Sequence, residues 1–68
     1  AVLNAANEEA VAAFLARGLR FDQICRVNRQ TLEELHPEAG ECASVEGLLN
    51  LDARARRHAQ ALIAALSA

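Results

Sequence analysis

The chain has 68 residues and a net charge of −2, with nine acidic residues against seven arginines and no lysine. This balance gives no general attraction to nucleic acid or to an acidic membrane surface, and no apolar stretch is long enough to span a bilayer. Sixteen residues are alanine, and only Phe14 and Phe21 are aromatic, so a chain this short can build only a small core.

The first predicted helix covers about residues 4–17. Apolar residues recur there at helical spacing and form one stripe: Leu3, Ala10, Val11, Phe14 and Leu15. Asn4 is a suitable N-cap, and Arg17 suits the negative end of the helix dipole. We expect Gly18 to end this helix in the left-handed conformation.

The second predicted helix covers residues 23–35, with Asp22 as its N-cap. Its apolar face is Ile24, Val27, Thr31, Leu32 and Leu35. The residue before Pro37 is disfavoured in helical geometry, so this helix should end near Leu35. The breakers Pro37 and Gly40 then predict a loop over residues 36–43.

Two helices are predicted after the loop. Ser44 is expected to cap a short one over residues 45–50, and Asn50 and Asp52 predict a break. Asp52 would cap the final helix, over residues 53–67, whose inner face is Ala55, Ala59, Leu62, Ile63 and Leu66. Its outward residues are Arg54, Arg57 and Gln60.

No segment shows the alternation typical of an exposed strand. We therefore predict an all-α fold: a small helical bundle of three main helices and one short helix, forming a single domain over residues 1–68. The carboxylates that lie at or near the predicted helix starts are Glu8, Glu9, Asp22, Glu46 and Asp52. We interpret them as structural, because acidic groups stabilise the positive end of a helix.

The sequence offers four candidate metal ligands, Cys25, His36, Cys42 and His58, at intervals that match no structural zinc site. Without a secretory signal we expect both thiols to be reduced. Cys25 is expected to pack as a small apolar group beside the second helix's stripe, and Cys42 to be a free thiol in the loop.

A Cys-His catalytic pair is also not expected. His36 and Cys42 share a flexible loop that does not hold a base against a thiolate, and the chain has no glycine-rich phosphate loop. His36 is expected to interact with the end of the second helix, and His58 to lie on a solvated or domain-facing surface. We predict no catalytic, cofactor-binding or metal-binding residue.

A helix-turn-helix alternative depends on four basic residues around the first turn and second helix: Arg17, Arg20, Arg26 and Arg29. Acidic residues occupy the same helix or its cap, namely Asp22, Glu33 and Glu34. No lysine supplements phosphate contacts. We therefore predict no nucleic-acid partner.

Several runs together resemble a known family. They are Ala-Val-Leu-Asn-Ala-Ala-Asn-Glu from residue 1, Val-Ala-Ala-Phe-Leu from residue 11, Arg-Phe-Asp-Gln-Ile from residue 20, Val-Glu-Gly-Leu-Leu from residue 45 and Leu-Asp-Ala-Arg-Ala-Arg from residue 51. In order and spacing they are similar to the C-terminal domain of the 1-deoxy-D-xylulose 5-phosphate reductoisomerase family. Each run is modestly specific, but they cover essentially the whole chain.

The resemblance implies an enzyme of non-mevalonate isoprenoid biosynthesis. Such enzymes convert 1-deoxy-D-xylulose 5-phosphate to 2-C-methyl-D-erythritol 4-phosphate with NADPH and Mg or Mn. The resemblance also implies that the cofactor, metal and substrate sites lie in other domains, so no catalytic residue is carried over to this sequence. The 68-residue segment alone is expected to be inactive.

By the same resemblance, the chain is part of a four-helix-type C-terminal domain, and its partners are the remaining domains of a cytoplasmic, homodimeric parent enzyme. The chain starts with Ala rather than Met, and we expect a processed or excised piece that begins inside that domain. Its stripe of Leu3, Val11, Phe14 and Leu15 would then be partly uncovered and drive self-association. The alternative is an independent helical interaction module that docks a partner helix.

Overall fold

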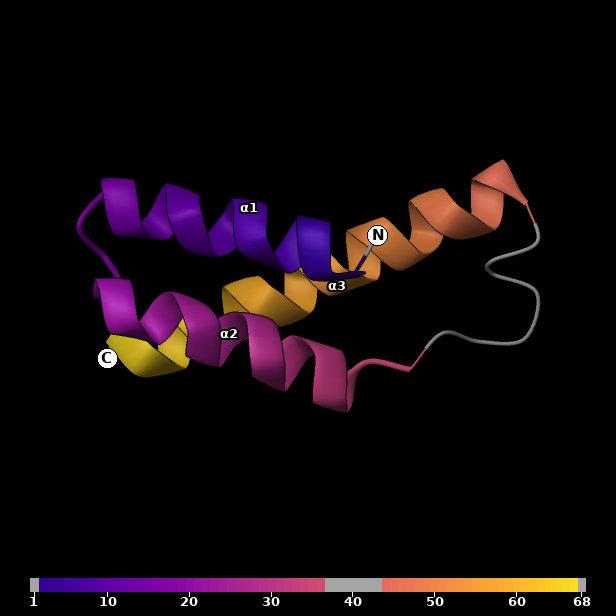
Figure 1. Cartoon of the computed structure of the whole chain (residues 1–68). Coiled ribbons are helices and arrows are strands. Elements are labelled where there is room, and N and C mark those ends of the chain that lie inside the picture. Colours follow the sequence, from indigo (N-terminus) through magenta and orange to yellow (C-terminus); the bar gives the residue numbers. More distant parts are fainter. Residues whose placement is uncertain (1, 37–43, 68) are drawn as a thin grey trace.

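The computed structural model describes residues 2–36 and 44–67, which form three helices: α1 (Val2–Leu15), α2 (Phe21–Glu34) and α3 (Val45–Ser67). α1 and α2 run antiparallel, and α3 returns from one end of the bundle to the other (Figure 1). α1 packs closely against both other helices, whereas α2 and α3 touch each other less. The predicted all-α class is confirmed. The predicted loop, with Pro37, Gly40 and Cys42, lies largely outside the described residues.

The helix predicted over residues 45–50 continues without interruption into the one predicted over 53–67, so the expected break and the cap at Asp52 are wrong. Leu51 is buried, and Asp52 Oδ2 accepts a hydrogen bond at 2.8 Å from Nε of Arg56, one turn later. A continuous helix makes both interactions possible. They offset the weak helix propensity of the Asn and Asp side chains in this stretch.

The starts of α2 and α3 are capped differently. Arg20, not the predicted Asp22, is the N-cap of α2. A guanidinium has no acceptor atom, and here the Gln23 Oε1 accepts the Arg20 backbone N–H at 2.9 Å. Ser44 caps α3 as predicted, because its Oγ accepts the N–H of Gly47 at 3.0 Å.

The buried face of α1 is made of alanine. Ala5, Ala6 and Ala10 are fully buried, whereas Leu3 and Leu15 of the predicted stripe are 50 % and 74 % exposed. The predicted inner face is therefore wrong for these two leucines. Small side chains let α1 approach two helices at once, which leaves its larger apolar residues on the outside. The helix already includes Asn4, whose predicted role as N-cap is also wrong.

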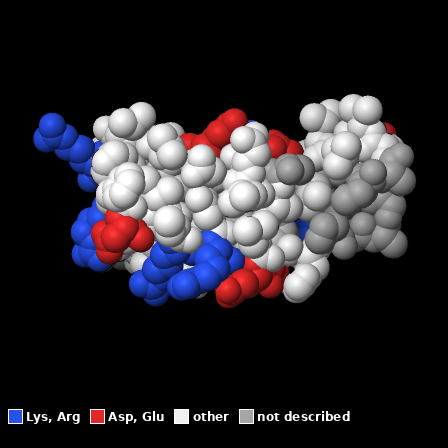
Figure 2. Space-filling view, in the orientation of Figure 1, with Lys and Arg blue, Asp and Glu red and all other residues white. Residues whose placement is uncertain are grey.

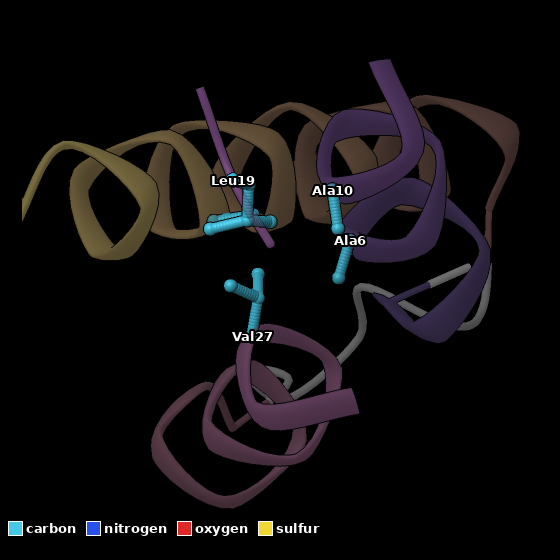
Figure 3. Close-up of a cluster of buried hydrophobic side chains, with 5 residues drawn as sticks. Ala6, Ala10, Leu19 and Val27 are labelled. Atoms are coloured by element: carbon cyan, nitrogen blue, oxygen red, sulfur yellow. The ribbon is translucent and has the colours of Figure 1, made fainter. Parts of the chain in front are cut away.

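The core lies where all three helices meet the turn between α1 and α2. Its buried members are Ala6, Ala10, Leu19, Val27 and Ala59, with Ala13, Ile24, Ile63 and Leu66 packed against them. Figure 3 shows Leu19 pointing from the turn towards Val27 and the α1 alanines. The predicted inner positions Val27 and Ala59 are confirmed. Leu19 lies in the turn, outside any helical periodicity, and was not predicted to be buried.

α2 buries part of its predicted face. Val27 and Thr31 are fully buried, but Leu32 is 47 % exposed. Leu35 is the C-cap of α2, as expected from the end predicted there, and its N–H donates to the Thr31 carbonyl oxygen at 3.0 Å. Thr31 Oγ1 has no hydrogen-bond partner in the described part of the chain.

The C-terminus of α1 forms a turn with two characteristic hydrogen bonds. The Gly18 N–H donates to the Ala13 carbonyl oxygen at 2.9 Å, and the Arg17 N–H donates to that of Phe14 at 3.0 Å. This is the Schellman pattern, in which the residue just after the helix is left-handed. That residue is Arg17, with φ of 64°, and not Gly18 as predicted.

The left-handed Arg17 predicts a stabilising substitution. Because a Cβ strains this conformation, Arg17→Gly should unfold with a free energy about 1 kcal/mol higher than Arg17→Ala. Both variants remove the same charge, so their difference isolates the backbone effect. Urea unfolding followed by circular dichroism measures it, and equal midpoints would show that the turn is not strained.

The unpaired hydroxyl of Thr31 predicts a second stabilising substitution. Thr31→Val keeps the branched shape and removes a buried polar group, so the free energy of unfolding should rise by about 1 kcal/mol. Thr31→Ser keeps the hydroxyl and loses a methyl group, so it should destabilise. Thermal melts of the three proteins test this, and a less stable valine variant would mean that the hydroxyl is paired.

Candidate functional site

The most connected polar group in the described part of the chain is the guanidinium of Arg56 on α3. Its Nη2 lies 2.8 Å from Glu8 Oε1, its Nη1 3.1 Å from Glu9 Oε2 and its Nε 2.8 Å from Asp52 Oδ2. Gln60 adds a fourth contact, because its Nε2 donates to Glu9 Oε1 at 2.9 Å. We call these five residues the Arg56 cluster; it joins α3 to α1.

Helix geometry explains how these side chains meet. Asp52, Arg56 and Gln60 are spaced four apart, so they follow one another along one face of α3. Glu8 and Glu9 lie on the facing stretch of α1. Five donors in a planar fork allow one guanidinium to hold three carboxylates, which an ammonium group would not do with the same geometry.

The contacts within the cluster shift the pKa of two of its groups, Glu9 and Arg56. A hydrogen bond from Gln60, then one from Arg56, lowers the pKa of the Glu9 carboxyl below its ordinary 4.5, although burial opposes the change. The pKa of the Arg56 guanidinium is raised, and its hydrogen bond to the Asp52 carboxylate contributes most to this change. Both directions oppose proton transfer, whereas a general acid or base needs a pKa near the working pH. The arrangement therefore suits fastening two helices and not acid-base chemistry.

Other polar contacts link the remaining helix pairs. His58, which was predicted to lie on a solvated or domain-facing surface, is partly buried, and its Nε2 on α3 lies 2.9 Å from Glu34 Oε1 on α2. Arg54, expected to point outward, is partly buried and donates from Nη2 to the His36 carbonyl oxygen at 3.2 Å. Between α1 and α2, Asn28 Nδ2 donates to Asn7 Oδ1 at 3.0 Å.

The candidate metal ligands do not converge in the described part of the chain, where no group of three or more His, Cys, Asp or Glu could hold an ion. Cys25 is exposed, so its predicted packing beside the apolar face of α2 is wrong. Cys42 lies outside the described residues. His36 is exposed directly after the C-cap of α2, and the interaction predicted for its side chain remains a prediction.

The predicted role of the carboxylates is confirmed for two of them. Asp22 and Glu46 lie in the first turns of α2 and α3. Glu8, Glu9 and Asp52 lie inside helices and belong to the Arg56 cluster, so their assignment to helix starts is wrong. The spacing of four between Asp52 and Arg56 was the one signal in the sequence that could have indicated it.

The basic residues weighed for nucleic-acid binding are partly occupied by neighbours. Arg20 Nε lies 3.2 Å from Asp22 Oδ1, Arg29 Nε lies 3.9 Å from Glu33 Oε1, and Arg26 Nε donates to Gln30 Oε1 at 3.3 Å. Each of these contacts is exposed and lies within one helix or at its cap. The carboxylates of Asp22 and Glu33 offset part of the positive charge of Arg20 and Arg29.

Two further observations describe the surface. Residues 2–36 and 44–67 form no pocket among themselves. None of the described helices combines the length and the apolar character needed to cross a membrane. The Arg56 cluster is a contact between two helices, α1 and α3.

Comparison with known proteins identifies the family. Residues 1–58 match the family described as DXP reductoisomerase C-terminal domain. The chain belongs to this family. Its predicted resemblance to the reductoisomerase C-terminal domain is therefore confirmed. No solved structure matches the chain.

Curated relatives agree over nearly the whole chain. The 1-deoxy-D-xylulose 5-phosphate reductoisomerase of Cupriavidus metallidurans is 49 % identical over 67 residues, which is 98 % of this chain and 17 % of the relative. That of Aeromonas hydrophila is 51 % identical over 65 residues, or 96 % of this chain and 16 % of the relative. The chain thus spans about one sixth of the length of the reductoisomerases that it matches.

The lowered pKa of Glu9 predicts an acid-dependent loss of stability. The contribution of Glu9 is present above pH 4.5 and is lost as the pH falls through the lower pKa of the folded state. Glu9→Gln should therefore be less stable than the wild type near neutral pH, by up to about 1 kcal/mol because the cluster is partly exposed. The difference should shrink in acid.

Urea unfolding at a series of pH values measures this effect. Glu33→Gln is the matched control, since Glu33 belongs to an exposed pair within one helix and should change the pH profile less. Parallel profiles for wild type and Glu9→Gln would rule out the Glu9 contribution.

Proposed function

We propose that this chain is the helical C-terminal domain of a reductoisomerase that converts 1-deoxy-D-xylulose 5-phosphate to 2-C-methyl-D-erythritol 4-phosphate. The observation that carries the proposal is the family match over residues 1–58, together with relatives of that name that are about six times longer. The parent enzyme would use NADPH and Mg or Mn and act as a cytoplasmic homodimer in isoprenoid biosynthesis.

Within that enzyme the chain supports the architecture and supplies no catalytic group. The Arg56 cluster supports this role, because its contacts join α1 to α3 and its hydrogen bonds lower the pKa of Glu9 and raise the pKa of Arg56. Substrate, cofactor and metal would bind in the remaining five sixths of the polypeptide.

A replacement experiment tests the function. In the Cupriavidus metallidurans enzyme, the segment that matches this chain is replaced by the chain, and a second version lacks the segment. We expect the chimera to oxidise NADPH with substrate and Mn, and the truncated version and the isolated chain to show no turnover. An inactive or unfolded chimera would contradict the proposal, and turnover by the isolated chain would contradict its purely structural role.

An independent helical interaction module is the alternative. The coding sequence upstream of Ala1 distinguishes the two. A contiguous reading frame with a nucleotide-binding glycine motif supports the enzyme, whereas an immediate start codon supports the module.

A further inference from the structure

One end of the bundle carries large apolar side chains that are open to solvent. Leu15, in the last turn of α1, is 74 % exposed, and Phe21, the first residue of α2, is 75 % exposed. The ring of Phe14 packs edge-on against that of Phe21, with centroids 5.6 Å apart and an interplanar angle of 66°. The two rings hold each other in place while most of Phe21 stays uncovered.

Two arginines lie between Leu15 and Phe21 in the sequence. Arg17 and Arg20 lie in the short connection between α1 and α2, and both are exposed. Basic side chains gather at this end of the molecule in Figure 2. The Arg20 guanidinium pairs with Asp22, whereas that of Arg17 has no partner in the described part of the chain. We call Phe14, Leu15, Arg17, Arg20 and Phe21 the turn patch.

The backbone of Arg17 adds an independent observation. A left-handed φ of 64° disfavours a residue with a Cβ, and glycine would relieve the strain. The Schellman turn requires this conformation at the position of Arg17, and the turn thereby fixes the place of the residue in the connection between α1 and α2. Its cation has no partner in the described part of the chain and lies in the segment between Phe14 and Phe21.

Further large apolar side chains are exposed elsewhere, namely Leu3, Leu32, Val45, Leu48 and Leu49. Val45 and Leu49, on the first turns of α3, are 75 % and 65 % exposed. They follow residues 37–43, which lie outside the described part of the chain, so their surroundings are not defined. All five residues of the turn patch lie within residues 2–36.

We propose that the turn patch docks onto the remaining part of the reductoisomerase polypeptide, at an apolar site that is rimmed by carboxylates. Aromatic residues and arginine are the types most enriched in the buried centres of protein interfaces. The occupant follows from chain length, since the chain spans 16–17 % of its relatives and the rest of such a polypeptide is always present at high effective concentration. Because the Arg17 guanidinium has no partner in the described part of the chain, we expect a carboxylate of the partner surface to pair with it. The inference rests on the proposed function.

Hydroxyl-radical footprinting tests the contact directly. The oxidation of Leu15 and Phe21 is compared between the isolated chain and the chimera with the Cupriavidus metallidurans enzyme. We expect severalfold less oxidation of both residues in the chimera. An active chimera in which both oxidise as fast as in the isolated chain overturns the docking face and leaves the proposed function intact, whereas an inactive, unfolded chimera overturns both.

Self-association through the same side chains is the competing outcome. Protection of Leu15 and Phe21 that already appears in the isolated chain, and that increases with its concentration, would assign the turn patch to a second copy. That result would overturn docking onto the rest of the polypeptide.

Charge variants test the acidic rim. Arg17→Glu and Arg17→Gln have comparable backbone strain but differ in charge, so Arg17→Gln is the matched control. We expect the denaturation midpoint of the glutamate variant to fall further below that of the glutamine variant in the chimera than in the isolated chain. An equal difference in both proteins means that no acidic partner faces Arg17 and overturns this part of the proposal.

Discussion

The close approach of three helices around the alanines of α1 is the constraint on which the rest of the structure depends. Ala6 and Ala10 on α1 and Ala59 on α3 are fully buried, and side chains this small bring the helix axes together. They also remove little apolar surface from water when they are buried. The larger residues Leu3 and Leu15 remain outside, where a partner surface can cover them. A small core and an exposed apolar exterior thus have the same cause.

Polar contacts between the helices complement this core. The Arg56 cluster, the pair of His58 with Glu34 and the pair of Asn28 with Asn7 each join a different pair of helices. Partly exposed ion pairs contribute little net stability, but they favour one alignment of two helices over others. Alanine surfaces fit together in several registers, so these contacts specify the arrangement that the apolar core leaves open.

Local signals in the sequence were sufficient where neighbouring residues decide the structure. The hydroxyl of Ser44 caps α3 as predicted, and the apolar spacing located Val27 and Ala59 in the core. Predictions from the sequence were wrong where contacts between distant residues determine which side chains are buried. Periodicity ranks leucine above alanine, so it assigned Leu3 and Leu15 to the inside of α1, whereas packing against two helices selects the smallest side chains.

The Arg56 cluster also depends on contacts that local sequence signals do not reveal. Asp52 was assigned to a helix start because an isolated Asp favours caps, but in the folded chain it belongs to a continuous helix that is supported by Leu51 and Arg56. Glu8 and Glu9 have their cationic partner 48 and 47 residues away, which no local pattern reveals. That separation also has a kinetic consequence. α1 and α2 can pair through a short turn, whereas the Arg56 cluster joins residues that are 47 and 48 positions apart. We therefore expect its contacts to form late in folding and chiefly to slow the rate of unfolding.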